Sequence, residues 1–164
     1  MIGLLIGRFQ PFHLGHLDAV KFALSKVSEL SIGIGSSNKF NEKRNPFTAD
    51  ERKEMIQSSL DKTMLEKIKI YYVPDVNDHE KWTYQIDEII PKYDVVFSND
   101  DFTHTLFGKR KIKVISVPLK QREILSGTDI RTKIKEGQDW SGLVPEGTKK
   151  VLLEINAKER LANL

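Results

Sequence analysis

The residues best suited to chemistry lie in the run GRFQPFHLGH, from Gly7 to His16, which follows an apolar segment and opens a helical pattern. His13 and His16 are three residues apart, so both imidazoles lie near one face of the first helical turn, where each can donate a hydrogen bond to a phosphate oxygen. A helix N-terminus also presents free N–H groups that attract anions. Gly7 and Gly15 permit a ligand to approach the backbone closely. The run therefore predicts a phosphate-binding turn.

The spacing of His13 and His16 alone leaves two other interpretations open. Histidines three residues apart can bind a metal ion, although no third ligand of Cys or His type stands nearby and the pattern is not HExxH. They can also be a purely structural pair. The phosphate interpretation is favoured because glycines, an arginine and both histidines fall together in ten residues directly after the first apolar run.

A second anion site is indicated near the C-terminus, where the sequence reads SGTDIR from Ser126 to Arg131. Ser126 is the predicted N-cap of a helix and Asp129 occupies its third position. The amides and hydroxyls of Ser126, Gly127 and Thr128 form a cradle for an anion, and Arg131 projects from the same first turn. Taken alone, the segment is equally compatible with an ordinary capped surface helix.

Short apolar runs alternate along the chain with helical patterns, and these elements must position the groups described above. This alternation predicts an α/β fold with a Rossmann-like, doubly wound parallel sheet of five or six strands and helices on both faces. In such sheets ligands bind beyond the carboxyl ends of the strands, which is where both motifs fall. The expected strands are Ile2–Ile6, Ser31–Gly35, Ile68–Val73, Asp94–Ser98 and Ile112–Val117. The expected helices are Leu14–Lys26, one opened by a Thr48/Glu51 capping box, Trp82–Ile90, Ser126–Ile134 ending near Gly137, and Glu146–Leu161.

Length and composition exclude several classes of protein. The 164 residues are expected to form one domain, residues 1–164, with a C-terminal helical segment at about 145–164. The absence of cysteine excludes disulfides, thiolate metal sites and a cysteine nucleophile. No apolar run approaches the ~18 residues of a membrane span, so we expect a cytoplasmic protein without a membrane partner. The net charge of +3 gives no reason to expect a nucleic-acid partner.

Three motifs together resemble one enzyme family. GRFQPFHLGH is similar to the HxGH-type signature of the nucleotidylyltransferase superfamily, and Ser126, Thr128 and Arg131 match its SxTxxR motif. The GRFQPFH form, and the run NPFTADER from Asn45 to Arg52, resemble the archaeal type of nicotinamide-nucleotide adenylyltransferase. The two phosphate motifs stand at opposite ends of the chain, so the resemblance spans nearly all of it.

The resemblance implies that ATP is one substrate. Its triphosphate would lie on the two phosphate motifs, and the turn after the fourth expected strand, Ser98-Asn99-Asp100, would lie near the adenosine. Arg122 can reach a phosphate or pair with Glu123 or Asp129. The ATP-binding residues implied in this way are Gly7, Arg8, Phe9, His13, Gly15, His16, Asn99, Asp100, Ser126, Gly127, Thr128 and Arg131.

Nicotinamide mononucleotide is the second substrate that the resemblance implies. Trp82 would stack on the cationic nicotinamide ring, an attraction of about 0.5–2 kcal/mol, although core packing is the alternative for this side chain. Asp75 would lie near the carboxamide. His79 stands where the family often has Asn, so Asn77 is the substitute contact. The implied residues of this subsite are Gly35, Ser36, Arg44, Phe47, Asp75, Asn77 and Trp82, and the polar loop Asn38–Lys43 beside them has the composition of a phosphate-binding lid.

The chemistry that follows is adenylyl transfer to the mononucleotide, with formation of NAD and release of pyrophosphate. The attacking phosphate is already ionised, so the reaction needs positioning and charge stabilisation rather than a protein nucleophile. The expected catalytic residues are His13, His16, Arg8, Arg44 and Arg131. Mg²⁺ would be held mainly by substrate phosphates. The resemblance also implies a homo-oligomer, often a hexamer.

Two further classes of function share some of these features. Nucleotidylyltransferases for pantetheine phosphate, FMN or glycerol phosphate have the same phosphate motifs and differ in the acceptor pocket, where NPFTADER, Asp75 and Trp82 favour the nicotinamide acceptor. A nucleotide- or RNA-binding module without catalysis is the second alternative. A fragment of an aminoacyl-tRNA synthetase is disfavoured, because 164 residues leave no room for a tRNA-binding domain.

Overall fold

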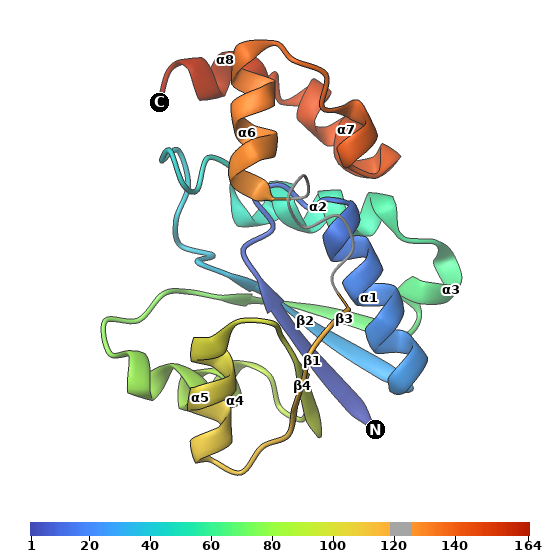
Figure 1. Ribbon diagram of the computed structural model, residues 1–164, viewed down its shortest axis with the longest axis vertical. Helices are drawn as coiled ribbons and strands as arrows, with labels where there is room; N and C mark the ends of the chain where they lie inside the picture. Colours follow the sequence, from blue (N-terminus) through green and yellow to red (C-terminus); the bar gives the residue numbers. More distant parts are fainter. Residues whose placement is uncertain (119–125) are drawn as a thin grey trace.

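Parallel strands run through the middle of the protein, and helices pack on both sides of them (Figure 1). The computed structural model describes residues 1–118 and 126–164. In these ranges five strands form one sheet in the order β3-β2-β1-β4-β5, and all neighbours pair in parallel. The predicted α/β class and the doubly wound, Rossmann-like sheet are confirmed. The strands are β1 (Ile2–Gly7), β2 (Glu29–Gly35), β3 (Ile68–Val73), β4 (Val95–Phe97) and β5 (Val114–Ile115).

The order of the strands locates the ligand crevice. The chain builds β1, β2 and β3 outward to one edge and then returns to place β4 on the other side of β1. β1 and β4 are therefore adjacent strands whose connections leave in opposite directions, and a crevice opens between their carboxyl ends. Leu5 of β1 lies in register with Phe97 of β4, so Gly7 and Ser98 follow at that edge.

Alternating side chains of the strands fill two separate cores, one on each face of the sheet. On one face Leu5 and Phe97 pack with α1 and α2, and on the other Leu4 and Val96 pack with α4 and α5. This two-sided burial explains why the strands are continuous apolar runs rather than alternating apolar and polar ones. The helices around the sheet are α1 (Leu14–Lys26), α2 (Ala49–Ser59), α3 (Lys62–Leu65), α4 (Trp82–Ile89) and α5 (Asp101–Lys109), with a 3-10 turn η1 (His79–Lys81) before α4.

The C-terminal helices pack beside α2 at one end of the molecule, as Figure 1 shows. They are α6 (Gly127–Glu136), α7 (Glu146–Glu154) and α8 (Ala157–Ala162), with a 3-10 turn η2 (Ser141–Leu143) between the first two. Gly147 allows α7 to approach α2 closely, because a Cβ there would lie 2.2 Å from the backbone of Ser58. Ile134, Leu152 and Leu161 join the same apolar core as α1 and α2.

Some expected helices differ from the observed ones. The pattern Glu146–Leu161 predicts one helix, and this is wrong: the chain breaks into α7 and α8 at Asn156, whose φ of 53° is left-handed. α3 and α5 were not predicted. α5 is mostly polar and contains threonine and glycine, which favour a loop by intrinsic propensity, but Leu106 and Phe107 bury it against the sheet and Asp100 caps it.

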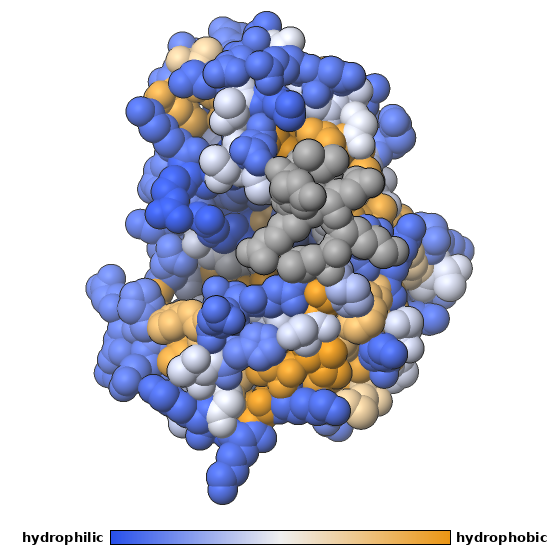
Figure 2. Space-filling model, viewed as in Figure 1, coloured by the Kyte–Doolittle hydropathy of each residue, from blue (hydrophilic) through white to orange (hydrophobic). Residues whose placement is uncertain are grey.

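Hydrophilic residues cover most of the face seen in Figure 2, and hydrophobic residues show in patches in both halves, the largest of them in the half that carries the sheet with α4 and α5. No helix within residues 1–118 and 126–164 is long and apolar enough to cross a membrane.

Candidate active site

The two histidines of the first turn cap helix α1 with their own side chains. Nδ1 of His13 accepts hydrogen bonds from the backbone N–H groups of Gly15 (3.1 Å) and His16 (3.4 Å). Nδ1 of His16 in turn accepts from the N–H of His13 (3.1 Å), which completes a capping box made of imidazoles. The two rings stack with their centroids 3.7 Å apart. Both rings are therefore fixed in orientation before any ligand binds.

These contacts determine which nitrogen of each ring carries the proton. An Nδ1 that accepts a hydrogen bond has no hydrogen, so each neutral ring carries its proton on Nε2 and offers it as a donor. Burial lowers the pKa of His13 to about 4. Burial, and then repulsion from His13, hold the pKa of His16 well below its usual value. At neutral pH the pair is uncharged, and it offers two Nε2–H donors to an anion.

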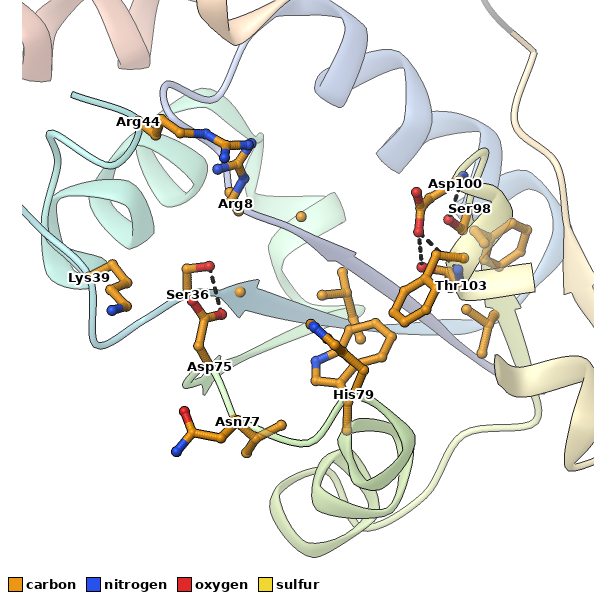
Figure 3. Close-up of a pocket in the computed structure, with 18 residues that line it drawn as sticks. Arg8, Ser36, Lys39, Arg44, Asp75, Asn77, His79, Ser98, Asp100 and Thr103 are labelled. Carbon is orange, nitrogen blue, oxygen red and sulfur yellow. Dashed lines mark hydrogen bonds between the residues drawn. The ribbon is translucent and has the colours of Figure 1, made fainter. Parts of the chain in front are cut away.

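A cavity of about 790 Å³ opens at the carboxyl ends of β1, β2 and β4 and at the segment after β3. Figure 3 shows Arg8 and Arg44 on one side of this cavity, Ser98 and Asp100 on the opposite side, and His79 between them. Its volume lies in the range of ligand pockets for molecules of nucleotide size. The site residues expected from the sequence that line it are Gly7, Arg8, Gly35, Ser36, Arg44, Asp75, Asn77, Trp82 and Asp100.

A second cavity of about 280 Å³ lies on the α1 side of the same sheet edge. His13, Gly15 and His16 line it from the first turn, and Asn99 and Asp100 line it from the turn after β4. Asp100 therefore borders both cavities, so they are neighbours across the end of β4. All five of these residues were expected to bind ATP.

Three arginines from distant parts of the chain converge beside the large cavity. Arg8 follows β1, Arg44 precedes the NPFT segment, and Arg131 stands in the first turn of α6. Burial lowers the pKa of Arg131, and repulsion from Arg8 and Arg44 lowers it further. Because these cations repel one another in the free protein, an anion that binds among them relieves the repulsion. The oxygens of a polyphosphate carry the charge that such a site favours.

The wall of the large cavity formed by the end of β2 and the segment after β3 contains a small hydrogen-bond network. The hydroxyl of Ser36 donates to Oδ1 of Asp75 (2.8 Å), and the N–H of Asp75 donates to the side chain of Asn38 (2.9 Å). These bonds join the end of β2 to the segment after β3. Trp82 is half-buried: it packs edge-on against Phe107 at 5.9 Å and also lines the cavity, so it contributes to both core and pocket.

Gln10 connects the three sequence motifs. Its buried side-chain amide donates to the carbonyl of Phe47 (3.1 Å) and accepts from the N–H of Phe47 (3.0 Å). Its own carbonyl accepts from Nη1 of Arg131 (2.7 Å). The first turn, the NPFT segment and the start of α6 are thus joined through one residue.

The start of α6 lies against the first loop rather than in either cavity. Ser126 caps the helix by accepting from the N–H of Asp129 (3.1 Å), as predicted. Gly127 leaves room for this close approach, because a Cβ there would make a tight contact of 3.1 Å with the carbonyl of Gln10. Nη2 of Arg131 donates to the hydroxyl of Thr128 (3.4 Å). The assignment of Ser126, Gly127, Thr128 and Arg131 to ATP phosphates stays a prediction.

Two expected binding residues point into the core. The side chains of Phe9 and Phe47 are buried in the apolar core with α1 and α2, so only their backbone atoms remain to meet a substrate. The side chain of Asn99 is occupied as well, because it exchanges two hydrogen bonds with the backbone of Val117 (2.9 and 2.7 Å). Arg122 lies outside the described residues.

Sequence reasoning missed several cavity residues and two residues that hold the cavity together. Gln10 and Arg52 stand inside GRFQPFH and NPFTADER, so the signal for their importance was present, but their partners are backbone atoms that no pattern specifies. The missed residues lining the large cavity include Val76, Phe102 and Thr103, whereas Lys39, His79 and Ser98 lie in segments that the sequence had already indicated.

No group of three or more His, Asp and Glu side chains is placed to hold a metal ion within residues 1–118 and 126–164. Within the described residues, no third side chain therefore joins His13 and His16 as a metal ligand. A metal ion at this site would need most of its oxygens from a substrate.

A parallel sheet of this order, with a helix N-terminus directly after β1 and arginines gathered near the switch point, is the architecture of a doubly wound nucleotide-binding fold. The family model described as cytidylyltransferase-like matches residues 4–133. Among solved structures, a bifunctional NMN adenylyltransferase/ADP ribose pyrophosphatase from Francisella tularensis, complexed with AMP and a manganese ion, aligns with a TM-score of 0.78 at 22% identity, covering 98% of this chain and 52% of that one.

Curated relatives narrow the class. A nicotinamide-nucleotide adenylyltransferase from Pyrococcus furiosus is 40% identical over 99% of this chain and 88% of its own length. One from Archaeoglobus fulgidus is 38% identical over 100% of this chain and 97% of its own length. The chain belongs to the family of nicotinamide-nucleotide adenylyltransferases, as its three motifs predicted.

Proposed function

We propose that this protein transfers the adenylyl group of ATP to nicotinamide mononucleotide, forming NAD and pyrophosphate. Membership of the family supports the reaction. The observation in this chain that carries it is the neutral histidine pair, whose two Nε2–H donors sit at a helix N-terminus beside converging arginines. That arrangement suits a polyphosphate and contains no base or nucleophile, and transfer between phosphates requires neither.

The two cavities suit the two substrates. The smaller one, between the first turn and the end of β4, would take the adenosine and the α-phosphate, with His16 nearest the phosphorus. The larger one would take the mononucleotide, with its phosphate toward Arg8 and Arg44 and its ring toward Trp82 and His79. Ile6, near the end of β1, borders both cavities, and the phosphates of both substrates would meet beside it.

The reaction is a single displacement at the α-phosphorus. An oxygen of the mononucleotide phosphate forms a bond to that phosphorus while the bond to the oxygen bridging to the β-phosphorus breaks, and pyrophosphate leaves with that electron pair. The histidine Nε2–H groups donate to the equatorial oxygens, and Arg131 and Arg44 stabilise the charge that moves to the leaving group. Holding both phosphates at one sheet edge supplies the remaining rate enhancement through proximity.

Mg²⁺ would enter with ATP as part of that substrate. Three or more phosphate oxygens and water would supply its ligands, with carboxylates such as Asp100 within the surrounding wall. The ion neutralises phosphate charge when bound. We also propose that the protein works in the cytoplasm as a homo-oligomer, with a hexamer as the expected state, which light scattering of the purified protein would measure.

The function is tested with a panel of acceptors. The purified protein is incubated with ATP, Mg²⁺ and either nicotinamide mononucleotide, nicotinic acid mononucleotide, phosphopantetheine, FMN or glycerol phosphate, and pyrophosphate is measured. We expect release with nicotinamide mononucleotide and NAD in equal amount. Release of pyrophosphate with only another acceptor would indicate a different nucleotidylyltransferase, and no release with any acceptor would indicate a binding module.

A further inference from the structure

The side chain of Arg52 is an unusual occupant of the interior. It stands in α2, is 0% exposed, and donates every one of its N–H groups to a backbone carbonyl. Nε donates to Thr48 (3.1 Å), Nη1 to Arg8 (2.9 Å) and Gly35 (2.8 Å), and Nη2 to Ser36 (3.2 Å) and Lys39 (3.4 Å). Five donors meet five acceptors, so none is left for a substrate.

Four of these five acceptors belong to residues that line the large cavity. Arg8 comes from the first loop, Gly35 and Ser36 from the end of β2, and Lys39 from the start of the polar loop. Figure 3 shows Arg8, Ser36 and Lys39 around the same part of the cavity. Arg52 itself lies behind this wall, where its guanidinium joins the first loop to the end of β2 and to the start of the polar loop, which is also held by a hydrogen bond from the N–H of Lys39 to the carbonyl of Ser36 (3.0 Å).

A charge in this place is costly, which argues against simple packing as its role. None of the described Asp or Glu residues forms a salt bridge with Arg52. Burial lowers its pKa to about 10, so the guanidinium stays protonated at neutral pH. An apolar side chain would fill the same volume without the desolvation cost, but it could not bind five carbonyls at fixed angles. The planar guanidinium of Arg52, whose N–H groups point in fixed directions, meets this requirement.

We propose that Arg52 is a positioning residue for the acceptor subsite: its guanidinium fixes the backbones of Arg8, Ser36 and Lys39 and so sets the wall that receives the mononucleotide phosphate. The proposal rests on the proposed function for the identity of that phosphate. Lysine at this position keeps the charge but has three donors and no fork, so the wall should loosen while the core stays filled.

The first test separates positioning from stability through the two Michaelis constants. Arg52→Lys and the uncharged Arg52→Gln are compared with Arg160→Lys, a matched control. Arg160 is likewise an arginine that binds a backbone carbonyl, although it is half-buried rather than fully buried; it joins α8 to Glu51 and to the carbonyl of Pro46, neither of which lines the cavity. We expect KM for nicotinamide mononucleotide to rise at least ~10-fold relative to KM for ATP in both Arg52 variants, with an unchanged ratio in Arg160→Lys.

The second test needs no substrate. Trypsin cleaves after Lys39, Lys43 and Arg44, so a loosened wall should be cut faster in the Arg52 variants than in Arg160→Lys of similar Tm. The proposal would be overturned if the Arg52 variants changed both KM values by the same factor, or if they kept the wild-type ratio of KM values and the wild-type rate of cleavage. It would also be overturned if both Arg52 variants failed to fold. If the wild-type protein forms no NAD, the proposed function fails, and the cleavage comparison still decides the role of Arg52.

Discussion

Protonation of the buried histidine pair should destabilise the protein. The folded state holds the pKa of His13 at about 4, whereas an unfolded chain has the usual value near 6.5. Because the folded pKa is lowered, the unfolded state binds more protons between these values, and stability falls as the pH falls below ~6.5. The full effect is ~3 kcal/mol, at 1.36 kcal/mol for each unit of the pKa difference. About 1.3 kcal/mol of it should be lost between pH 7.5 and pH 5.5.

His13→Asn provides the comparison. An asparagine oxygen can accept the same N–H bonds at the N-cap and does not titrate, so the helix keeps its cap while the pH-dependent contribution of His13 disappears. Urea unfolding of both proteins at several pH values gives the difference in their slopes. Contributions that do not involve His13 are common to both proteins and cancel in that difference; His16 is the exception, because it loses the repulsion from His13 in the variant.

The outcome is decided above pH 5, where few carboxylates protonate. We expect the free energy of unfolding of the wild type to fall by ~1 kcal/mol more than that of His13→Asn on going from pH 7.5 to pH 5.5. Superimposable pH dependence of the two proteins would refute the claim that His13 is held neutral. It would also remove the argument for Nε2–H donors in place of imidazolium ions.

Three further outcomes are expected from substitutions. His16→Ala should lower kcat by more than ~10²-fold with a normal far-UV spectrum, because a donor to the transition state is lost, and near-normal turnover would remove His16 from the mechanism. Trp82→Ala should raise KM for the mononucleotide and leave KM for ATP unchanged, whereas an unchanged mononucleotide KM would assign Trp82 to the core alone. Glu51→Ala removes both the capping-box partner of Thr48 and the ion pair with Arg160, so urea unfolding should show a loss of ~2 kcal/mol, and a loss below ~0.5 kcal/mol would contradict that reasoning.

The sheet could be predicted because a strand that is buried on both faces has a recognisable local sequence. Each strand is a short apolar run, and the order of strands and helices along the chain restricts the topology. Helix ends could be predicted as well, from the side-chain capping box of Thr48 and Glu51 and from the glycine at 137, which ends α6 in a left-handed conformation. α5 was missed because its stability comes from Leu106 and Phe107 packing on the sheet rather than from local propensity.

Many residues that line the two cavities could be predicted, but the residues that hold the cavity walls in place could not. His13, His16 and the cavity arginines stand in recognisable motifs, since their residue types carry the chemistry. Gln10 and Arg52 bind backbone carbonyls of Phe47, Arg8 and other distant residues, and any residue type supplies such a carbonyl. Phe9 and Phe47 illustrate the converse, because a place inside a motif did not reveal that their side chains face the core.

The hydrogen bond from Arg131 to the carbonyl of Gln10 also has a meaning for biosynthesis, because it joins residues 121 positions apart. At ~5–20 residues per second, the ribosome needs roughly 6–24 seconds to add the partner of the first loop after that loop has been made. The strands and α1 can assemble in the meantime, since their contacts are nearer in sequence. A nascent chain therefore carries the histidine turn without the arginine from α6 until residue 131 has been added, and the contact between Gln10 and Arg131 forms only after that.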